Sequence, residues 1–259
     1  MSTHVTTEQV KELRDATGIS VMQCRKALEE AAGDMKKALA ILKKTSSDIA
    51  LKKGDREVKD GRVAVKLEGG KAVLVTLLCE TDFVAKNEDF TALLGALTEK
   101  AFAEGAEKMR AGAKEMIDPV IQKTGENIQL GDIYEVTGDI MSDYVHNNKI
   151  GVIVSLLGGD TGLAKDIAMH IAAMKPEYIS PSEITDEAQK TMREIFEKEV
   201  AAIDKPEEIK KKMLEGKIAT YFKERTLLDQ AFIKNGDMTV GKLLEEKNAK
   251  IKEVKRYSI

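Results

Sequence analysis

An acidic residue and a large aromatic residue stand side by side just after a predicted buried strand. The strand is indicated by a run of mostly β-branched and apolar residues from Val73 to Cys79. Asp82 and Phe83 follow it closely, and the segment from Asn87 has the composition of a helix start. We therefore expect both side chains on the connection between a strand and a helix, where they can contact a partner.

Two interpretations of this pair are open. In the first, Phe83 folds back into the core and Asp82 caps the following helix. In the second, both side chains point into solvent and form part of a binding surface. The residues alone favour the first interpretation, because large aromatic side chains are usually buried.

Other motifs give no sign of an enzyme, a metal or a cofactor. His4, His146 and His170 are too far apart in sequence for metal-ligand spacing, and neither Cys24 nor Cys79 lies in a Cys-x-x-Cys motif. Both cysteines are expected to be reduced residues of the core. We expect no metal, no cofactor and no covalent chemistry.

A glycine-rich segment invites comparison with a phosphate-binding loop. Gly158–Lys165 lies between a predicted strand and a predicted helix, but it lacks the adjacent Gly-Lys-Ser/Thr of such loops. A plain turn is the favoured interpretation. No Gly-x-Ser-x-Gly elbow or other named nucleophile motif is present in the sequence.

Composition limits the class of protein further. The chain has 259 residues, of which 42% are hydrophobic and 33% charged, and this is typical of a globular protein. No apolar run approaches the roughly 20 residues that cross a bilayer, and the first residues do not form a signal peptide. We expect a cytoplasmic protein. A net charge of −3 and an aromatic content of 4% argue against a general nucleic-acid binder.

Capping residues and turn glycines divide the start of the chain into three short helices. Their predicted starts are Thr7, Ser20 and Asp34, each followed by apolar residues at helical spacing. We expect a compact three-helix bundle over residues 1–54. The charged segment Lys43–Lys59 shows no apolar period, which predicts a helix end and a linker.

Two segments of mixed strand and helix character follow. In residues 55–127, a hairpin with a Gly-Gly turn precedes a helical apolar stripe. In residues 128–182, an extended segment and a buried strand precede a second helix. The similarity of Arg62–Val65 to Lys149–Val152 suggests internal duplication. The predicted fold class is α+β, with two small core subdomains that each pair an antiparallel sheet with a helix.

The last part of the chain changes character twice. Residues 183–226 have helical apolar stripes with charged opposite faces and a break at Asp204–Pro206. This pattern predicts an inserted antiparallel helical hairpin, or coiled coil, whose apolar stripes pack together. Residues 227–259 predict a short helix and a final strand that close the second core subdomain.

Two of these patches together resemble bacterial elongation factor Ts, the nucleotide exchange factor of elongation factor Tu. One is the Thr-Asp-Phe-Val run Thr81–Val84, and the other is the N-terminal bundle with Val10–Arg14 and Cys24–Leu28. The resemblance covers nearly the whole chain. It implies a ubiquitin-associated-like N-terminal bundle and a projecting coiled coil. Some members have an additional C-terminal helix beyond the point where this sequence ends, so contacts from such a helix are not expected.

The resemblance also implies a function. It implies a guanine nucleotide exchange factor that binds GDP-bound and nucleotide-free elongation factor Tu in a one-to-one complex. In the family, the Asp-Phe pair wedges between helices of the GTPase domain near the magnesium and phosphate site. The bundle grips the same domain, and a histidine contacts a distal β domain. The partner-binding residues implied here are Thr81, Asp82, Phe83, Val84, Val21, Met22, Arg25 and His146.

Other interpretations remain open at this point. Arg25 is also typical of a solvated helix residue, and His146 of a loop histidine with local hydrogen bonds. The alternative function is a helical interaction adaptor that binds a protein partner without altering nucleotide affinity. A hydrolase or transferase site built from distant carboxylates has no supporting motif.

Overall fold

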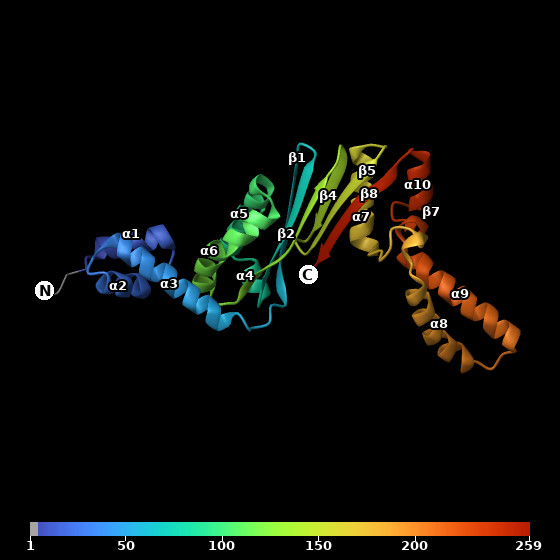
Figure 1. Ribbon diagram of the computed structural model, residues 1–259, viewed down its shortest axis with the longest axis horizontal. Helices are drawn as coiled ribbons and strands as arrows, with labels where there is room; N and C mark the ends of the chain where they lie inside the picture. The colour runs from blue at the N-terminus through green and yellow to red at the C-terminus, as the bar shows by residue number, and fades with distance from the viewer. Residues whose placement is uncertain (1–4) are drawn as a thin grey trace. The chain divides into compact units, whose positions relative to one another are not determined.

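The computed structural model describes residues 5–259, so His4 lies outside the described residues. The chain is a mixture of helices and small sheets, which confirms the predicted α+β class (Figure 1). It divides into two compact units. The first contains the chain up to Glu135 with Asn147–Gly151 and Tyr257–Ile259, and the second contains Val136–His146 and Val152–Arg256. In the described part of the chain, no helix is long and apolar enough to span a membrane.

The first unit begins with three capped helices. Thr6 forms a capping box with Gln9, Gly18 has a left-handed φ of 65°, and Ser20 and Asp34 cap the next two helices through their side chains. The three predicted helix starts are therefore confirmed. Their interior includes Leu13, Cys24 and Leu28. The helices are α1 (Thr7–Thr17), α2 (Val21–Glu30) and α3 (Met35–Lys53).

A helix end does fall within Lys43–Lys59, but it lies at Lys53, so the prediction of a linker is wrong for residues 43–53. Ala50 is buried in the core of the first unit, and Ile49 packs against that core. Ser47 Oγ also donates to Asp118 Oδ2 at 2.6 Å. The charged sequence is helical because it has a tertiary partner, the helix α6 (Ala106–Thr124).

A hairpin forms two of the three strands of the first sheet. β1 (Asp60–Glu68) and β2 (Lys71–Cys79) are antiparallel, and their two-residue turn places Gly69 and Gly70 at φ 56° and 78°. Only glycine adopts such angles without strain, which explains the Gly-Gly pair. The sheet order is β1-β2-β3, where β3 is Ile128–Thr137. We expected residues 128–182 to open the second subdomain, whereas β3 is the third strand of this first sheet.

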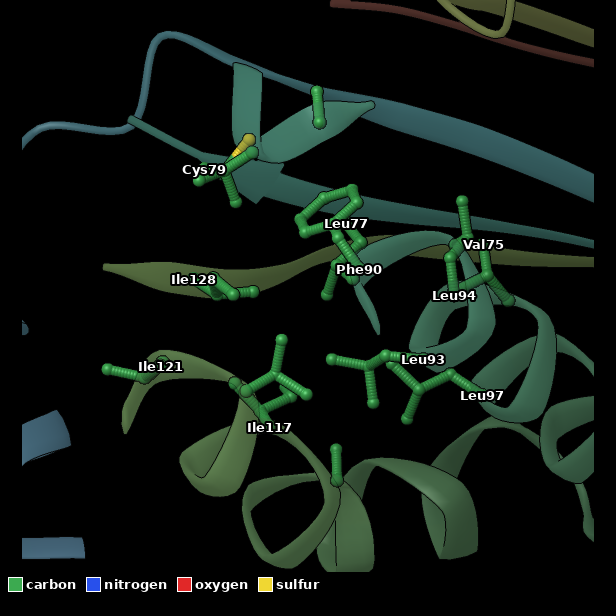
Figure 2. Packing of buried hydrophobic residues seen from close by; sticks show 14 of the residues in the cluster. Val75, Leu77, Cys79, Phe90, Leu93, Leu94, Leu97, Ile117, Ile121 and Ile128 are labelled. Atoms are coloured by element: carbon green, nitrogen blue, oxygen red, sulfur yellow. The ribbon is translucent and has the colours of Figure 1, made fainter. Parts of the chain in front are cut away.

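Helices α4 (Asp82–Ala85), α5 (Glu88–Glu104) and α6 complete this unit. Phe90 of α5 is fully buried and belongs to the same core as Leu77 of β2 (Figure 2). Ile117 and Ile121 of α6 belong to the same core. The sequence did not predict α6, which contains Pro119.

The second unit repeats the sheet order of the first. Its sheet has the order β4-β5-β8, formed by β4 (Ile140–His146), β5 (Ile150–Leu157) and β8 (Lys250–Ser258). In each sheet, two consecutive strands precede a helix and a later strand joins the second of them. This shared topology supports internal duplication. In this topology β1 corresponds to β4 and β2 to β5. Arg62–Val65 lies in β1 and Lys149–Val152 at the start of β5, so these two similar segments do not occupy equivalent positions.

Helix α7 (Thr161–Met174) packs against β4 and begins after the predicted glycine turn. Gly158 and Gly159 have φ values of 79° and 75°, and Asp160 Oδ1 accepts a hydrogen bond from Leu163 N at 2.8 Å. A carboxylate therefore occupies the N-terminus of α7, where a phosphate would otherwise bind. The plain-turn interpretation fits this geometry.

Two long helices form an antiparallel pair in the second unit. Lys217 Nζ donates to Glu199 Oε2 at 2.7 Å, and the rings of Phe196 and Tyr221 meet edge to face with centroids 5.7 Å apart. Few of the pair's apolar residues are buried: Val200, Leu214 and Phe222. The helices are α8 (Asp186–Ala201) and α9 (Glu207–Arg225). Short elements close the unit: η1 (Pro181–Glu183), η2 (Leu227–Asp229), β6 (Ala231–Phe232), β7 (Asn235–Thr239) and α10 (Val240–Glu246).

His170 of α7 is a structural residue that is linked through Gln230 to the end of α9. Its Nδ1 accepts a hydrogen bond from Ile233 N at 3.2 Å, so the neutral ring donates from Nε2 to Gln230 Oε1, 2.9 Å away. Gln230 Nε2 in turn donates to Glu224 O, in α9, at 2.6 Å. Burial lowers the pKa of His170, although the Gln230 hydrogen bond opposes that shift.

Replacing His170 should change the pH dependence of stability. The lowered pKa disfavours protonation of His170 in the native state, while the unfolded chain binds a proton below about pH 6.5. The free energy of unfolding should therefore fall as pH decreases through this range. From pH 7.5 to 5.5, urea unfolding should show a larger loss of the free energy of unfolding for the native chain than for His170→Gln, by at most about 1.4 kcal/mol, the limit set by protonation of the unfolded histidine. Equal losses for His170→Gln and the native chain would contradict the assignment.

Candidate partner-binding site

The residues Thr81–Ala85 form a single helical turn at the end of β2. Thr81 has extended dihedrals of φ −132° and ψ 159°, and its Oγ1 accepts a hydrogen bond from Val84 N at 3.4 Å. Ala85 N then donates to Thr81 O at 3.1 Å, and Lys86 N to Asp82 O at 3.2 Å. A threonine cap thus converts the strand directly into the turn of α4.

The two faces of this turn have opposite environments. Val84 and Ala85 are buried in the core of the first unit. Phe83 is 83% exposed, the largest exposed fraction among the large hydrophobic side chains of the described residues. The interpretation in which Phe83 folds into the core is therefore wrong, and a large apolar ring stands in solvent.

Asp82 does not cap the following helix. Asn87 has that role, since its Oδ1 accepts from Asp89 N at 2.8 Å. Asp82 is instead the first residue of α4, and its Oδ2 lies 2.6 Å from Lys86 Nζ. Both side chains are largely exposed, so this ion pair contributes at most about 1 kcal/mol and leaves the carboxylate accessible.

The residues beneath the turn are structural. The Cys79 Sγ is buried and donates to Thr81 O at 3.2 Å. Burial, followed by the negative charges of Asp60 and Glu126, raises the pKa of the Cys79 thiol to about 12. The thiol is therefore protonated at neutral pH, as expected for a core cysteine.

A second exposed apolar group lies on α2. Val21 is 48% exposed and Met22 82%, and Arg25 follows at helical spacing on the same face. Cys24 and Leu28 of the same helix point into the bundle core. The outer face of α2 therefore has exposed apolar side chains beside Arg25, and it is not the simple solvated charged surface that Arg25 alone would indicate.

Lys123, at the end of α6, brings the bundle close to the start of α5. Its Nζ donates to Asp89 Oδ1 at 2.9 Å, and the same side chain lies against Gly18, in the connection between α1 and α2. A Cβ at Gly18 would collide with this lysine. The structure therefore joins the segment just before Val21 to the first turn of α5, a link that no sequence motif indicated.

His146 belongs to the second unit and is the exposed last residue of β4. Its Nδ1 lies 3.0 Å from Tyr144 Oη, on the same strand. Local hydrogen bonding, the alternative considered for this residue, is therefore present. Among residues 5–259, no group of three or more His, Cys, Asp or Glu side chains is arranged to hold a metal ion.

Comparison with known proteins agrees with the resemblance. The model of the family described as Elongation factor TS matches residues 80–259, a range that starts at Glu80 and includes the whole turn. The chain belongs to the elongation factor Ts family. This family acts in translation elongation, and nucleotide exchange is its role there.

Curated relatives match almost the full chain. Elongation factor Ts of Hahella chejuensis is 41% identical over 262 residues, covering 98% of this chain and 92% of that protein. The protein of the same name from Nitrosospira multiformis is 40% identical over 271 residues, covering 98% and 90%. That of Pseudomonas fluorescens Pf0-1 is 39% identical over 252 residues, covering 95% and 88%.

Two phenylalanines should respond very differently to truncation. Phe83→Ala should leave the free energy of unfolding within about 0.5 kcal/mol of the native value, because the ring is already in solvent. Phe90→Ala should cost about 3–5 kcal/mol, because it empties a fully buried site. Urea unfolding monitored by circular dichroism tests both. A large loss for Phe83→Ala would mean that the ring is buried in solution.

Proposed function

We propose that this chain is a guanine nucleotide exchange factor that binds elongation factor Tu carrying GDP and promotes GDP release. It makes and breaks no covalent bond. The observation that carries the proposal is the exposed Phe83 ring on a turn whose other face is buried. Family membership supports it, because nucleotide exchange is the family's role.

The proposed step is insertion of Phe83, with Asp82 beside it, between helices of the partner's GTPase domain near the magnesium and phosphate site. Burying a phenylalanine side chain contributes about 1.5–3 kcal/mol. If that burial occurs only in the nucleotide-free complex, GDP affinity falls by the same free energy, about 10- to 160-fold. The ring alone therefore supplies a substantial part of an exchange factor's effect.

Rigidity of the turn is what allows the ring to act on the partner. Val84 and Ala85 fix the inner face of α4 in the core, and Thr81 caps its N-terminus through a hydrogen bond from Val84 N. Little backbone freedom remains to be lost when the complex forms, so more of the burial free energy is available to shift the partner's conformation. We assign Thr81 and Val84 to the site for this reason.

The remaining residues give the complex its affinity. Val21, Met22 and Arg25, on one face of α2, bind the same GTPase domain, and His146 contacts a distal β domain. The complex contains one copy of each protein. The bundle is of the ubiquitin-associated type. The proposed domains are residues 1–54, 55–127, 128–182, 183–226 (coiled coil) and 227–259, except that β3 (Ile128–Thr137) belongs with residues 55–127, whose sheet it completes.

Truncating the exposed ring should reduce exchange activity. Release of a fluorescent GDP from elongation factor Tu is followed under excess unlabelled nucleotide, with the native chain or with Phe83→Ala. We expect the stimulated rate of GDP release to be at least about tenfold lower with the variant than with the native chain, since one buried aromatic contact is missing. Leu51→Ala is the matched control, because Leu51 is also an exposed apolar residue, at 70%. It should stimulate release like the native chain.

The same assay separates exchange factor from adaptor. If the native chain binds elongation factor Tu without accelerating GDP release, the adaptor function replaces the proposed one. If the native chain accelerates release but Phe83→Ala does so equally well, the wedge assignment is wrong, although exchange activity stands.

A further inference from the structure

Two glutamates accept hydrogen bonds where β2 ends and β3 begins, each from the residue that follows the other glutamate. Glu126 Oε1 accepts from Thr81 Oγ1 at 2.6 Å, and its Oε2 accepts from Thr81 N at 3.0 Å. In return, Glu80 Oε1 accepts from Asn127 N at 2.6 Å. The pair Glu80–Thr81 and the pair Glu126–Asn127 are thus joined in both directions, because the glutamate of each pair accepts a hydrogen bond from a backbone N–H of the other pair. We call these four residues the carboxylate clamp.

The clamp is anchored on the segment that follows α3. Asn127 is buried, and its Nδ2 donates to Arg56 O at 2.7 Å and to Gly54 O at 3.3 Å. Arg56 Nη1 also lies 3.4 Å from Glu80 Oε1. Three segments that are distant in sequence therefore meet at the base of the turn that carries Phe83.

Glu126 acts on this turn through the hydroxyl of Thr81. That hydroxyl donates its hydrogen to Glu126 and keeps a lone pair for Val84 N, the bond that caps α4. Hydrogen bonds to a carboxylate are stronger than neutral ones, so Glu126 fixes the direction of the Thr81 side chain. The chain of bonds runs from Glu126 to Thr81 to the backbone of the turn.

We propose that Glu126 is a positioning residue for nucleotide exchange. It holds the α4 turn so that Phe83 and Asp82 enter the partner in one orientation. This inference rests on the proposed function. Without Glu126, the Thr81 N–H and hydroxyl lose their carboxylate and the turn gains alternative orientations. A displacement of about 1 Å at a functional group can cost up to about a hundredfold in rate, and we expect on the order of tenfold here.

The first test measures motion of the turn and needs no partner. The chain contains no tryptophan, so Phe83→Trp places a single indole on the turn. Time-resolved fluorescence anisotropy of this indole should show greater local motion when Glu126→Ala is added. Glu115→Ala removes an exposed carboxylate from α6 that pairs with Lys43 instead, and it should leave the anisotropy unchanged.

The second test measures GDP release at saturating concentrations of the exchange factor, in chains that retain Phe83. Glu126→Ala should lower the maximal release rate about tenfold, with Glu126→Gln in between because it keeps one acceptor oxygen. A purely structural loss would instead reduce the folded fraction. It would raise the concentration needed for half-maximal release and leave the maximal rate unchanged.

The outcomes separate the two proposals. A native maximal rate for Glu126→Ala, or unchanged motion of the indole, would overturn the positioning role. If the native chain itself fails to stimulate release, the proposed function fails, while the anisotropy still decides whether Glu126 holds the turn. Should Glu126→Ala not fold, Glu126→Gln and Thr81→Val carry both measurements.

Discussion

Burial of Val84 and Ala85 is the constraint on which the candidate site depends. Successive residues of a helical turn point about 100° apart, so a turn that buries these two small side chains must direct Phe83 away from the core. The exposed ring is thus a consequence of packing next to it. Because the ring is not buried in the free protein, the free energy of burying it remains available for binding a partner.

The surrounding elements keep this turn in place. Phe90 belongs to the same core as Val84 and Ala85, where α5 packs on the hairpin of β1 and β2. The carboxylate clamp fixes its first residue, and Lys123 links the start of α5 to the bundle that carries Val21 and Met22. The Phe83 turn and the exposed face of α2 are therefore attached to one packed framework.

Local signals in the sequence predicted most elements well. Capping residues such as Ser20 and Asp34, and the Gly-Gly turn of the hairpin, act within a few residues and are visible without a structure. Family resemblance then supplied the candidate site residues. Long-range contacts were not visible. The end of α3 is charged, and only its packing on α6 explains why it stays helical.

The exposure of Phe83 shows the same limit at the site itself. Composition favoured a buried ring, because an isolated phenylalanine is usually a core residue. What decides its direction is that Val84 and Ala85 are buried instead, and their neighbours come from α5 and the sheet. The clamp residue Glu126 carries no motif, since its role depends on a contact 45 positions away in sequence.

The most direct test of the wedge is the affinity of the native chain for two forms of elongation factor Tu. Titration calorimetry would compare the nucleotide-free form with the GDP-bound form. An inserted ring that competes with nucleotide predicts tighter binding to the nucleotide-free form by at least about tenfold, with GDP weakening the complex by the same factor. Equal affinities for the two forms would contradict it.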